Sequence, residues 1–291
     1  MRFRWPWRDE SARLARTARP RCVLFTGAAG ALGTAVLPSL TDSAENWRLV
    51  DARGALPGGF TDCHVRELGA ADAHELFDGV DAVVHFAAQS IPAQPAILRY
   101  RNVDTVAWLL DSMQRSGIRR LVYASSMHVM GMYERTEVIG PDSTPRPDGP
   151  YGESKRRAEA LIQGACASTD LSALILRIGH AEHNVEKAEP ANWLAMADLV
   201  RLIDIGLNCE FAGAPVVHAV TPHRGDDMQQ HAFAKTFGMT WSDAPSYRNA
   251  MKRVAQWYGN DAMARQYRGG VFASGRADAE FGVSRDAGLD A

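Results

Sequence analysis

The sequence predicts an α/β fold built on a doubly wound parallel sheet, with a small C-terminal substrate lobe. Short apolar runs alternate with helical patterns from residue 21 to residue 179. The first run stops at a glycine-rich turn, as a buried parallel strand does. Right-handed β-α-β crossovers connect strands through helices of this length and place helices on both faces of the sheet. This arrangement is the Rossmann type of α/β architecture.

Five apolar runs mark the expected strands of this sheet. They occupy residues 21–27, 47–52, 81–88, 119–126 and 171–179. Helical patterns lie between them at residues 29–41, 72–80 and 102–117, and a further helix opens after Pro150. The pattern at 102–117 has apolar residues at helical spacing and a glycine stop at Gly117, so its end is well marked.

The alternation weakens after His180. Residues 180–193 look like a polar loop, residues 194–207 like a helix and residues 214–221 like a strand. Beyond them the chain shows only short helical patterns and turns before a polar tail. We therefore expect a small lobe there and no independent domain.

Composition narrows the class of partner. The formal net charge of −2 gives no electrostatic reason to expect nucleic acid or an anionic membrane. No apolar run is long enough for a membrane span. The four cysteines are scattered, which favours reduced thiols in the cytoplasm over a disulfide framework or a zinc site. Their positions are Cys22, Cys63, Cys166 and Cys209.

The first 20 residues, MRFRWPWRDESARLARTARP, are rich in arginine and lack the apolar centre of a secretory signal. Two interpretations stay open. The segment is a poorly ordered extension ahead of the first strand, or an arm that docks onto a second subunit or an acidic surface.

A glycine loop, TGAAGALG, joins the first expected strand to the first expected helix. Its spacing places Gly27, Gly30 and Gly33 as G-x-x-G-x-x-G, a weak pattern alone because the chain has 25 glycines. Its position between strand and helix is the specific signal. Backbone N–H groups at the helix start, at Gly30, Ala31 and Leu32, can bind a pyrophosphate, while the third glycine lets helix and strand pack. The loop predicts a dinucleotide site.

Asp51, at the end of the second strand, is a second expected cofactor contact. A carboxylate there accepts hydrogen bonds from the ribose 2′-hydroxyl and repels a 2′-phosphate, which favours NAD over NADP. Arg53 argues the other way, since a nearby arginine can accommodate that phosphate. Ala87, where the third strand ends, is also expected to contact the cofactor.

These signals divide the chain into three expected parts. Residues 1–20 are the extension, and residues 21–179 are the dinucleotide-binding Rossmann domain. Residues 180–291 are the small substrate-side lobe with the C-terminal tail.

Ser126, Tyr151 and Lys155 form a candidate catalytic set. A hydride leaves a carbinol carbon as the hydroxyl proton is removed, and a tyrosine can remove it if its pKa falls from about 10 toward neutrality. Lys155, one helical turn after Tyr151, can supply the cation that lowers this pKa and can bind the cofactor ribose. Ser126 ends a strand, where ligands bind in open α/β sheets, and can orient the substrate oxygen. Combined with the glycine loop, the set predicts a proton-transfer site.

With these motifs the chain resembles the extended short-chain dehydrogenases/reductases of the NAD-dependent epimerase/dehydratase class, from Cys22 to about Phe281. It is more similar still to the NAD-dependent uronate (hexuronic acid) dehydrogenases. That likeness rests on TGAAGALG, HFAAQS with Asn102 downstream, ASSMH, GPDSTPRPDGPYGESK, LRIG and YRGGVFA. The proline-rich segment before Tyr151 and the GG-x-F motif near the C-terminus are more specific for this family than the motifs shared by the whole superfamily.

The resemblance implies oxidation of the C1 hydroxyl of a cyclic uronate to an aldarolactone, with NAD as cofactor. By position, Ser126 and Tyr151 would contact the reacting hydroxyl, and Lys155 would serve phenol and ribose. Ser90 and His128 would line the sugar pocket. The resemblance also implies a homo-oligomer, such as a dimer.

Three departures from that family fall on the expected pocket. Met127 replaces an asparagine whose amide contacts the sugar, and a thioether is only a weak acceptor. His180 replaces a serine with a larger, titratable side chain. The family's carboxylate-binding arginine has no counterpart in residues 180–193, where Lys187 stands beside acidic residues. A lysine lacks the bidentate fork of an arginine.

Plainer interpretations of these residues stay open. Met127 fills the core, and His180 and His183 lie on the surface. The two histidines predict no metal site, because no third ligand stands at a suitable spacing. Arg99 or Arg101 supplies a substitute cation, or both are simply exposed.

The sequence thus predicts an NAD-dependent dehydrogenase acting on a sugar or sugar-acid hydroxyl, with Ser90, Met127, His128 and His180 as substrate candidates and no metal. A nucleotide-sugar epimerase or dehydratase with tightly bound NAD is the alternative enzyme, although the region after residue 180 is short for gripping a nucleoside diphosphate. The remaining alternative is a non-catalytic dinucleotide-binding protein, indicated by Met127 alone.

Overall fold

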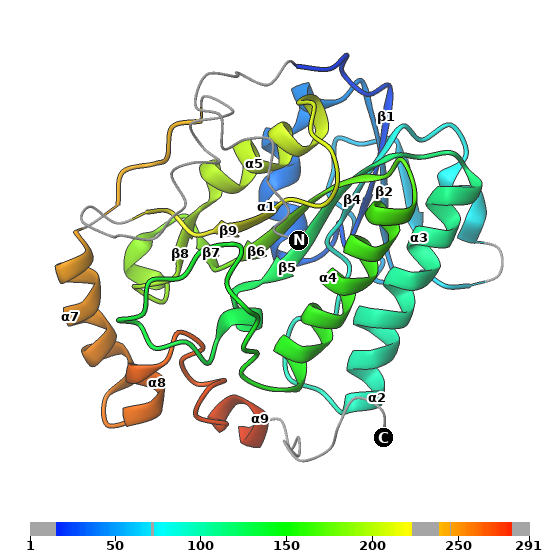
Figure 1. The fold of residues 1–291 in the computed structure, drawn as a ribbon. Coiled ribbons are helices and arrows are strands. Elements are labelled where there is room, and N and C mark those ends of the chain that lie inside the picture. The colour runs from blue at the N-terminus through cyan, green and yellow to red at the C-terminus, as the bar shows by residue number, and fades with distance from the viewer. Residues whose placement is uncertain (1–15, 71–72, 223–238, 245, 281–291) are drawn as a thin grey trace.

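The computed structural model describes residues 16–70, 73–222, 239–244 and 246–280, and within them a seven-stranded sheet lies at the centre (Figure 1). Its strand order is β3-β2-β1-β4-β5-β6-β9, and every neighbouring pair is parallel. The strands are β1 (Cys22–Thr26), β2 (Asn46–Asp51), β3 (Asp62–Val65), β4 (Ala82–His85), β5 (Arg120–Ser126), β6 (Ser172–Ile178) and β9 (Val216–Ala219). The order reverses between β1 and β4, the point at which open α/β sheets bind ligands.

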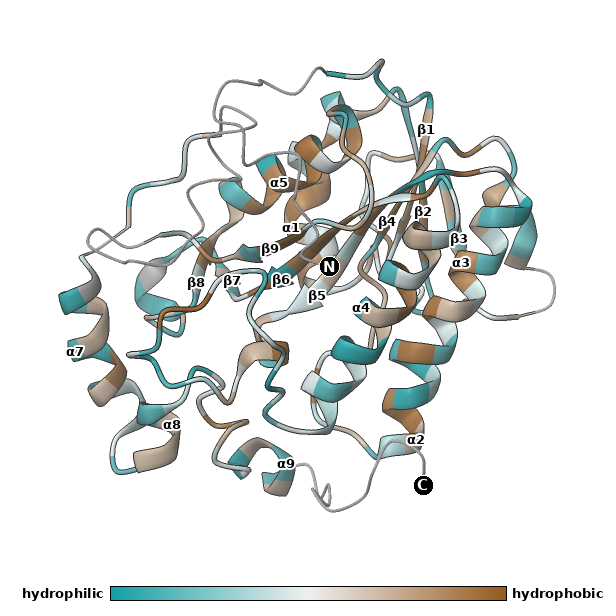
Figure 2. Cartoon of the chain, viewed as in Figure 1, coloured by the Kyte–Doolittle hydropathy of each residue, from teal (hydrophilic) through white to brown (hydrophobic). Residues whose placement is uncertain are grey.

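Helices cover both faces of this sheet. On one face lie α1 (Ala31–Val36) and α5 (Met196–Asn208), and on the other α3 (Thr105–Arg115) and α4 (Pro150–Ser168) (Figure 1). Two buried apolar clusters separate along the same division, one with Leu49 and Leu199 and the other with Leu121 and Ile162. Figure 2 shows the central strands largely brown and the outer helices banded with teal. The predicted doubly wound sheet is confirmed.

The remaining elements are short. They are α2 (Pro95–Leu98), a π-helical turn (Arg99–Asp104), β7 (His180–Glu182), β8 (Trp193–Ala195), α7 (Tyr247–Tyr258), α8 (Ala262–Gln266) and α9 (Arg276–Glu280), with several 3-10 turns. After α8 the chain returns to the segment that follows β5. There Gly269 N donates to Gly131 O at 2.8 Å, and Arg268 N donates to Tyr133 O at 2.9 Å. This return brings the C-terminal part against the N-terminus of α4.

Four local predictions were wrong. The edge strand β3 was not expected, because its short sequence DCHV alternates in burial and lacks an apolar run. The expected loop 180–193 contains β7 and the first residue of β8, which pair with each other. The expected helix 29–41 stops at Val36 and continues as a 3-10 turn that carries Pro38. The expected helix 72–80 is a 3-10 turn over Ala73–Phe77.

The arginine-rich extension lies, up to residue 15, outside the described residues, as does the tail 281–291. At the first described residue, Arg16 pairs with Asp204 of α5 at 3.1 Å. The next residue, Thr17, donates its N–H to Asn208 O at 2.8 Å. Across the described ranges, no helix is long and apolar enough to cross a membrane.

Candidate active site

The glycine loop between β1 and α1 is tightly packed against the end of β4. Gly27 has φ of +78°, and a Cβ there would overlap the backbone of Phe86 and Ala87. A Cβ on Gly33 would overlap the carbonyl oxygens of Gly27 and Ala28. Side chains are therefore excluded at both positions, for the turn at Gly27 and for the close packing of helix and strand at Gly33. Ala31 and Leu32 form the first turn of α1, and Gly30 caps it.

Asp51 links the end of β2 to this loop. Its Oδ2 accepts a hydrogen bond from Ala29 N at 3.0 Å, and its Oδ1 accepts one from Arg53 N at 2.9 Å. The Arg53 guanidinium pairs with the same carboxylate at 3.3 Å and is largely exposed. The structure thus brings Asp51, Ala87 and the three glycines together, and it places Arg53 beside them.

The catalytic candidates lie on β5 and α4. Ser126 ends β5, Tyr151 and Lys155 stand in the first two turns of α4, and all three are buried. The Ser126 hydroxyl lies close enough to the Tyr151 phenol to lower its pKa, and it also accepts a hydrogen bond from His128 N at 3.3 Å. Lys155 Nζ donates to the carbonyl of Ala124 at 2.9 Å. Strand and helix therefore hold the expected set in one place.

Burial dominates the protonation of this set. It raises the pKa of Tyr151 to about 12, against the lowering effect of Ser126 and with a further rise from the charge of Asp148. This direction is opposite to the fall expected from the sequence, because burial of the phenol outweighs its polar neighbours. Burial also lowers the pKa of Lys155 to about 7, against the opposite effect of Glu159. The pKa of the lysine thus lies near neutrality.

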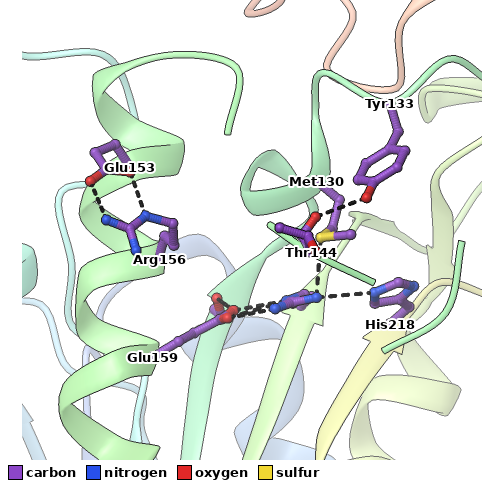
Figure 3. A network of polar contacts seen from close by, with 9 residues as sticks. Met130, Tyr133, Thr144, Glu153, Arg156, Glu159 and His218 are labelled. Carbon is purple, nitrogen blue, oxygen red and sulfur yellow. Dashed lines mark hydrogen bonds and ion pairs between the residues drawn. The ribbon is translucent and has the colours of Figure 1, made fainter. Parts of the chain in front are cut away.

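Glu159, one turn beyond Lys155, belongs to a buried polar network (Figure 3). Its carboxylate accepts a hydrogen bond from Ser125 Oγ at 2.5 Å and pairs with Arg177 at 2.8 Å. Arg177 also donates to the sulfur of Met130 at 3.1 Å and contacts His218 at 3.4 Å. The network connects α4 to β5 and β6 next to the candidate catalytic residues.

His128 and Phe272 form a wall next to Tyr151. His128 Nδ1 lies 2.7 Å from Oδ2 of Asp148. The His128 ring packs against Phe272 with centroids 3.9 Å apart, and it meets the Tyr151 ring edge-on at 5.6 Å. Phe272 is the aromatic residue of the GG-x-F motif, so that motif reaches the reaction centre from the far end of the chain.

The other substrate candidates lie less close together. Met127 is 4% exposed and packs in an apolar cluster with Val129, Met130 and Val220. His180 is exposed, and its Nδ1 accepts a hydrogen bond from Glu189 N within its own loop.

Ser90 is exposed in a loop that Asn102 holds. The Asn102 side chain bonds both backbone groups of Gln89 and, at 2.9 Å, Ser154 Oγ of α4. The Ser90 loop is thereby fixed relative to the catalytic helix.

The arginines considered as partners for a substrate carboxylate are paired with acidic residues. Arg99 pairs with Asp104 and Arg101 with Glu67, both at the surface. Residues 180–193 lack an arginine of their own, but the buried Arg135 enters from the segment after β5 and pairs with Glu189 at 3.0 Å.

Asp148, Glu159, Arg135 and Phe272 lie at or next to the candidate site and were not predicted as site residues. Glu159 had one usable signal, its position one helical turn after Lys155. Phe272 had another, the GG-x-F motif.

The comparisons with known proteins follow this geometry. A family model described as the NAD dependent epimerase/dehydratase family matches residues 23–199, more than half of the chain. The chain therefore belongs to the NAD-dependent epimerase/dehydratase family, and it is an NAD-dependent enzyme of the short-chain dehydrogenase/reductase type. This confirms the resemblance stated from the motifs.

Among its relatives, the uronate dehydrogenase of Pseudomonas syringae pv. tomato is 30% identical over 87% of this chain and 93% of the relative. The crystal structure of uronate dehydrogenase from Agrobacterium tumefaciens matches with a TM-score of 0.78 and 27% identity, over 87% of this chain and 97% of that one. A mutant of it is complexed with NAD. A UDP-glucose 4-epimerase from Azospirillum brasilense is 33% identical over 66% of this chain and 57% of its own length.

The residues present fit NAD. The glycine loop leaves no room for side chains where the backbone must approach a pyrophosphate, and the Asp51 carboxylate lies beside it. Within the described ranges, no group of three or more His, Cys, Asp or Glu residues is arranged to hold a metal ion.

Proposed function

We propose that this protein is an NAD-dependent dehydrogenase that oxidises the C1 hydroxyl of a cyclic sugar acid or related sugar to a lactone. The observation that carries the proposal is that Ser126, Tyr151 and Lys155 are buried close together where β5 ends and α4 begins. The glycine loop lies at the same carboxyl ends of the parallel strands, after β1. The extended match to uronate dehydrogenases supports the substrate class.

The chemistry divides among few side chains. Ser126 holds the substrate hydroxyl, and Tyr151 removes its proton at the phenol oxygen. Lys155, when charged, stabilises the Tyr151 phenolate that forms. Bound NAD supplies the hydride acceptor at C4 of the nicotinamide. Gly27, Gly30, Ala31, Leu32, Gly33, Asp51 and Ala87 would hold that cofactor, with Tyr151 and Lys155 near its reactive end.

We further propose an altered pocket for the sugar. Met127 packs in the core and provides no amide, and the arginine that reaches residues 180–193 is already paired with Glu189. Among the described residues that line this loop, a substrate carboxylate therefore meets an arginine that is already paired, and not the open fork that suits it best. Ser90, His128 and His180 are the proposed polar contacts of the sugar.

The test is NAD reduction with a panel of uronates, neutral aldoses, and sulfonated or aminated sugars, run beside Tyr151→Phe. We expect turnover with a sugar acid or related sugar, and a loss of about 100-fold or more in kcat for Tyr151→Phe. Full activity of Tyr151→Phe contradicts the mechanism. Efficient turnover of both galacturonate and glucuronate contradicts the altered pocket.

An epimerase or dehydratase remains the second candidate, because the Azospirillum brasilense UDP-glucose 4-epimerase is also similar. NAD retained through purification, with no net NADH formation on any sugar, would favour it. NADH binding without turnover on any sugar or nucleotide sugar would instead favour a non-catalytic role.

We also propose a cytoplasmic homo-oligomer, such as a dimer. Light scattering of the purified protein tests the oligomeric state, and a monomer at micromolar concentration would contradict it.

A further inference from the structure

Three glycines from three separate segments enclose one carboxylate, that of Asp148. A Cβ on Gly131 or Gly269 would overlap this carboxylate, and a Cβ on Gly152 would press on both the carboxylate and the His128 carbonyl. The Asp148 side chain is 0% exposed. Burying a carboxylate costs free energy unless it is hydrogen-bonded. Three positions around Asp148 have no room for a side chain, which indicates that this buried carboxylate has a specific role.

The exposed partner of this buried carboxylate is the His128 ring. Nδ1 of His128 lies 2.7 Å from Oδ2 of Asp148, and the ring keeps 26% of its side-chain surface open. Phe272 packs against the ring at 3.9 Å and also lies 6.0 Å from the Tyr151 ring. The ring is therefore fixed by Asp148 at one nitrogen, by Phe272 on a face and by the edge-on contact with Tyr151.

Hydrogen-bond chemistry assigns the proton on this ring. An ionised carboxylate only accepts hydrogen bonds, so Nδ1 carries the hydrogen that bridges to Asp148. In the neutral ring, Nε2 is then an acceptor with its lone pair available. Among the described residues, Nε2 makes no hydrogen bond, so its lone pair is open to a ligand.

We infer that Asp148 is a positioning residue, which holds His128 in the Nδ1–H form so that Nε2 presents a hydrogen-bond acceptor to a substrate hydroxyl beside Tyr151. The inference rests on the proposed function for the identity of the ligand as a sugar. It adds that this wall of the pocket accepts a hydroxyl group, while a carboxylate, which offers no donor, must bind elsewhere.

The first arm of the test is independent of activity. Nitrogen-15 NMR of histidine-labelled protein reports which ring nitrogen is protonated, and the His128→Phe variant assigns the His128 signals among those of the nine histidines. We expect a neutral ring with hydrogen on Nδ1 in the wild-type protein and a changed tautomer population in Asp148→Asn. Asp198→Asn, a buried aspartate bonded to Thr221 and Ser242, is the matched control and is expected to leave the signals unchanged.

A doubly protonated ring, or one with hydrogen on Nε2, would overturn the inference. This arm needs no folded Asp148 variant, since the wild-type spectrum alone decides the tautomer.

The second arm is a double-mutant cycle on turnover with the best sugar of the panel. We expect Asp148→Asn to lower kcat/KM about tenfold or more in the wild-type background and to have little further effect in the His128→Phe background. An equal fold-loss in both backgrounds would show that Asp148 is structural only, which overturns the inference. If no sugar is oxidised, the proposed function fails, and the ring tautomer still decides the role of Asp148.

Discussion

The Glu159 carboxylate and the Arg177 guanidinium form an ion pair at 2.8 Å in which each side chain is only 3% exposed. Glu159 stands one helical turn after Lys155, and its charge raises the pKa of that lysine against the effect of burial. One interaction therefore joins the packing of α4 on β6 to the protonation of a proposed catalytic residue.

Removing one partner of this ion pair tests how much the pair contributes to the stability of the fold. We expect Glu159→Gln to lower the free energy of unfolding by roughly 3–5 kcal/mol, because Arg177 is left buried without its counter-charge. The double variant Glu159→Gln/Arg177→Met should recover much of that loss. Urea unfolding measures both.

Glu153→Gln is the control on the same helix. Glu153 pairs with Arg156 at 2.6 Å in a more exposed setting (Figure 3). That change should cost about 1 kcal/mol or less. Equal losses of unfolding free energy in Glu153→Gln and Glu159→Gln would contradict the prediction that the buried ion pair contributes more to stability.

The glycine loop gives a prediction on cofactor binding. Gly27→Ala forces a side chain into the backbone of Phe86 and Ala87 at a φ of +78°. We expect weaker NADH binding, measured by fluorescence titration, together with a lower melting temperature. Gly164→Ala is the control, since Gly164 lies within α4 with nothing near its absent Cβ. That change should stabilise the protein by about 1 kcal/mol, and similar damage at both sites would contradict the prediction.

Cofactor selectivity is expected to depend on Asp51. Asp51→Asn removes the negative charge beside the glycine loop while leaving Arg53 in place. We expect the ratio of the NADPH to the NADH dissociation constant to fall, by about tenfold, because repulsion of a 2′-phosphate is lost. Arg53→Gln should move the ratio the other way. An unchanged ratio in Asp51→Asn would argue that the ribose does not bind at this carboxylate.

Lys155 makes stability depend on pH. Its pKa is 10.5 in the unfolded chain and about 7 in the fold, because burial disfavours the charge. Below the folded value both states are charged and the burial cost is fully present. Between the two values the unfolded state binds more protons, so stability rises with pH. We expect Lys155→Met to exceed the wild type by roughly a few kcal/mol at about pH 6, and this advantage to shrink toward about pH 10. A difference that stays constant across this range would contradict the assigned pKa.

Much of the fold was predictable because its signals are local. Buried parallel strands such as β1 and β6 are continuous apolar runs, and α3 has clear helical periodicity. The errors fell where the local signal was weak. Within the described part of the chain β3 pairs with β2 alone, at the edge of the sheet, so its residues alternate in burial. β7 and β8 have three residues each, too few to show a period.

The candidate site divides in the same way. Tyr151 and Lys155 share a helical turn, so their spacing alone brings them together. Ser126 could be predicted beside them because ligand-binding residues gather at strand ends in such sheets. The Asp148–His128 pair, the Glu189–Arg135 pair and the position of Phe272 depend on contacts between segments distant along the chain. The GG-x-F motif marks Phe272, but no period or short motif says which distant segment it contacts, and none pairs Asp148 with His128 or Glu189 with Arg135.

The enclosure of Asp148 by Gly269 has a consequence for biosynthesis. The seven strands of the described central sheet end by Ala219, whereas Gly269 and Phe272 lie further along the chain and leave the ribosome after them. A nascent chain can therefore assemble its sheet and glycine loop before the wall beside Tyr151 exists. On the proposed mechanism, we expect a C-terminal truncation before Gly269 to lack this wall and to lose turnover.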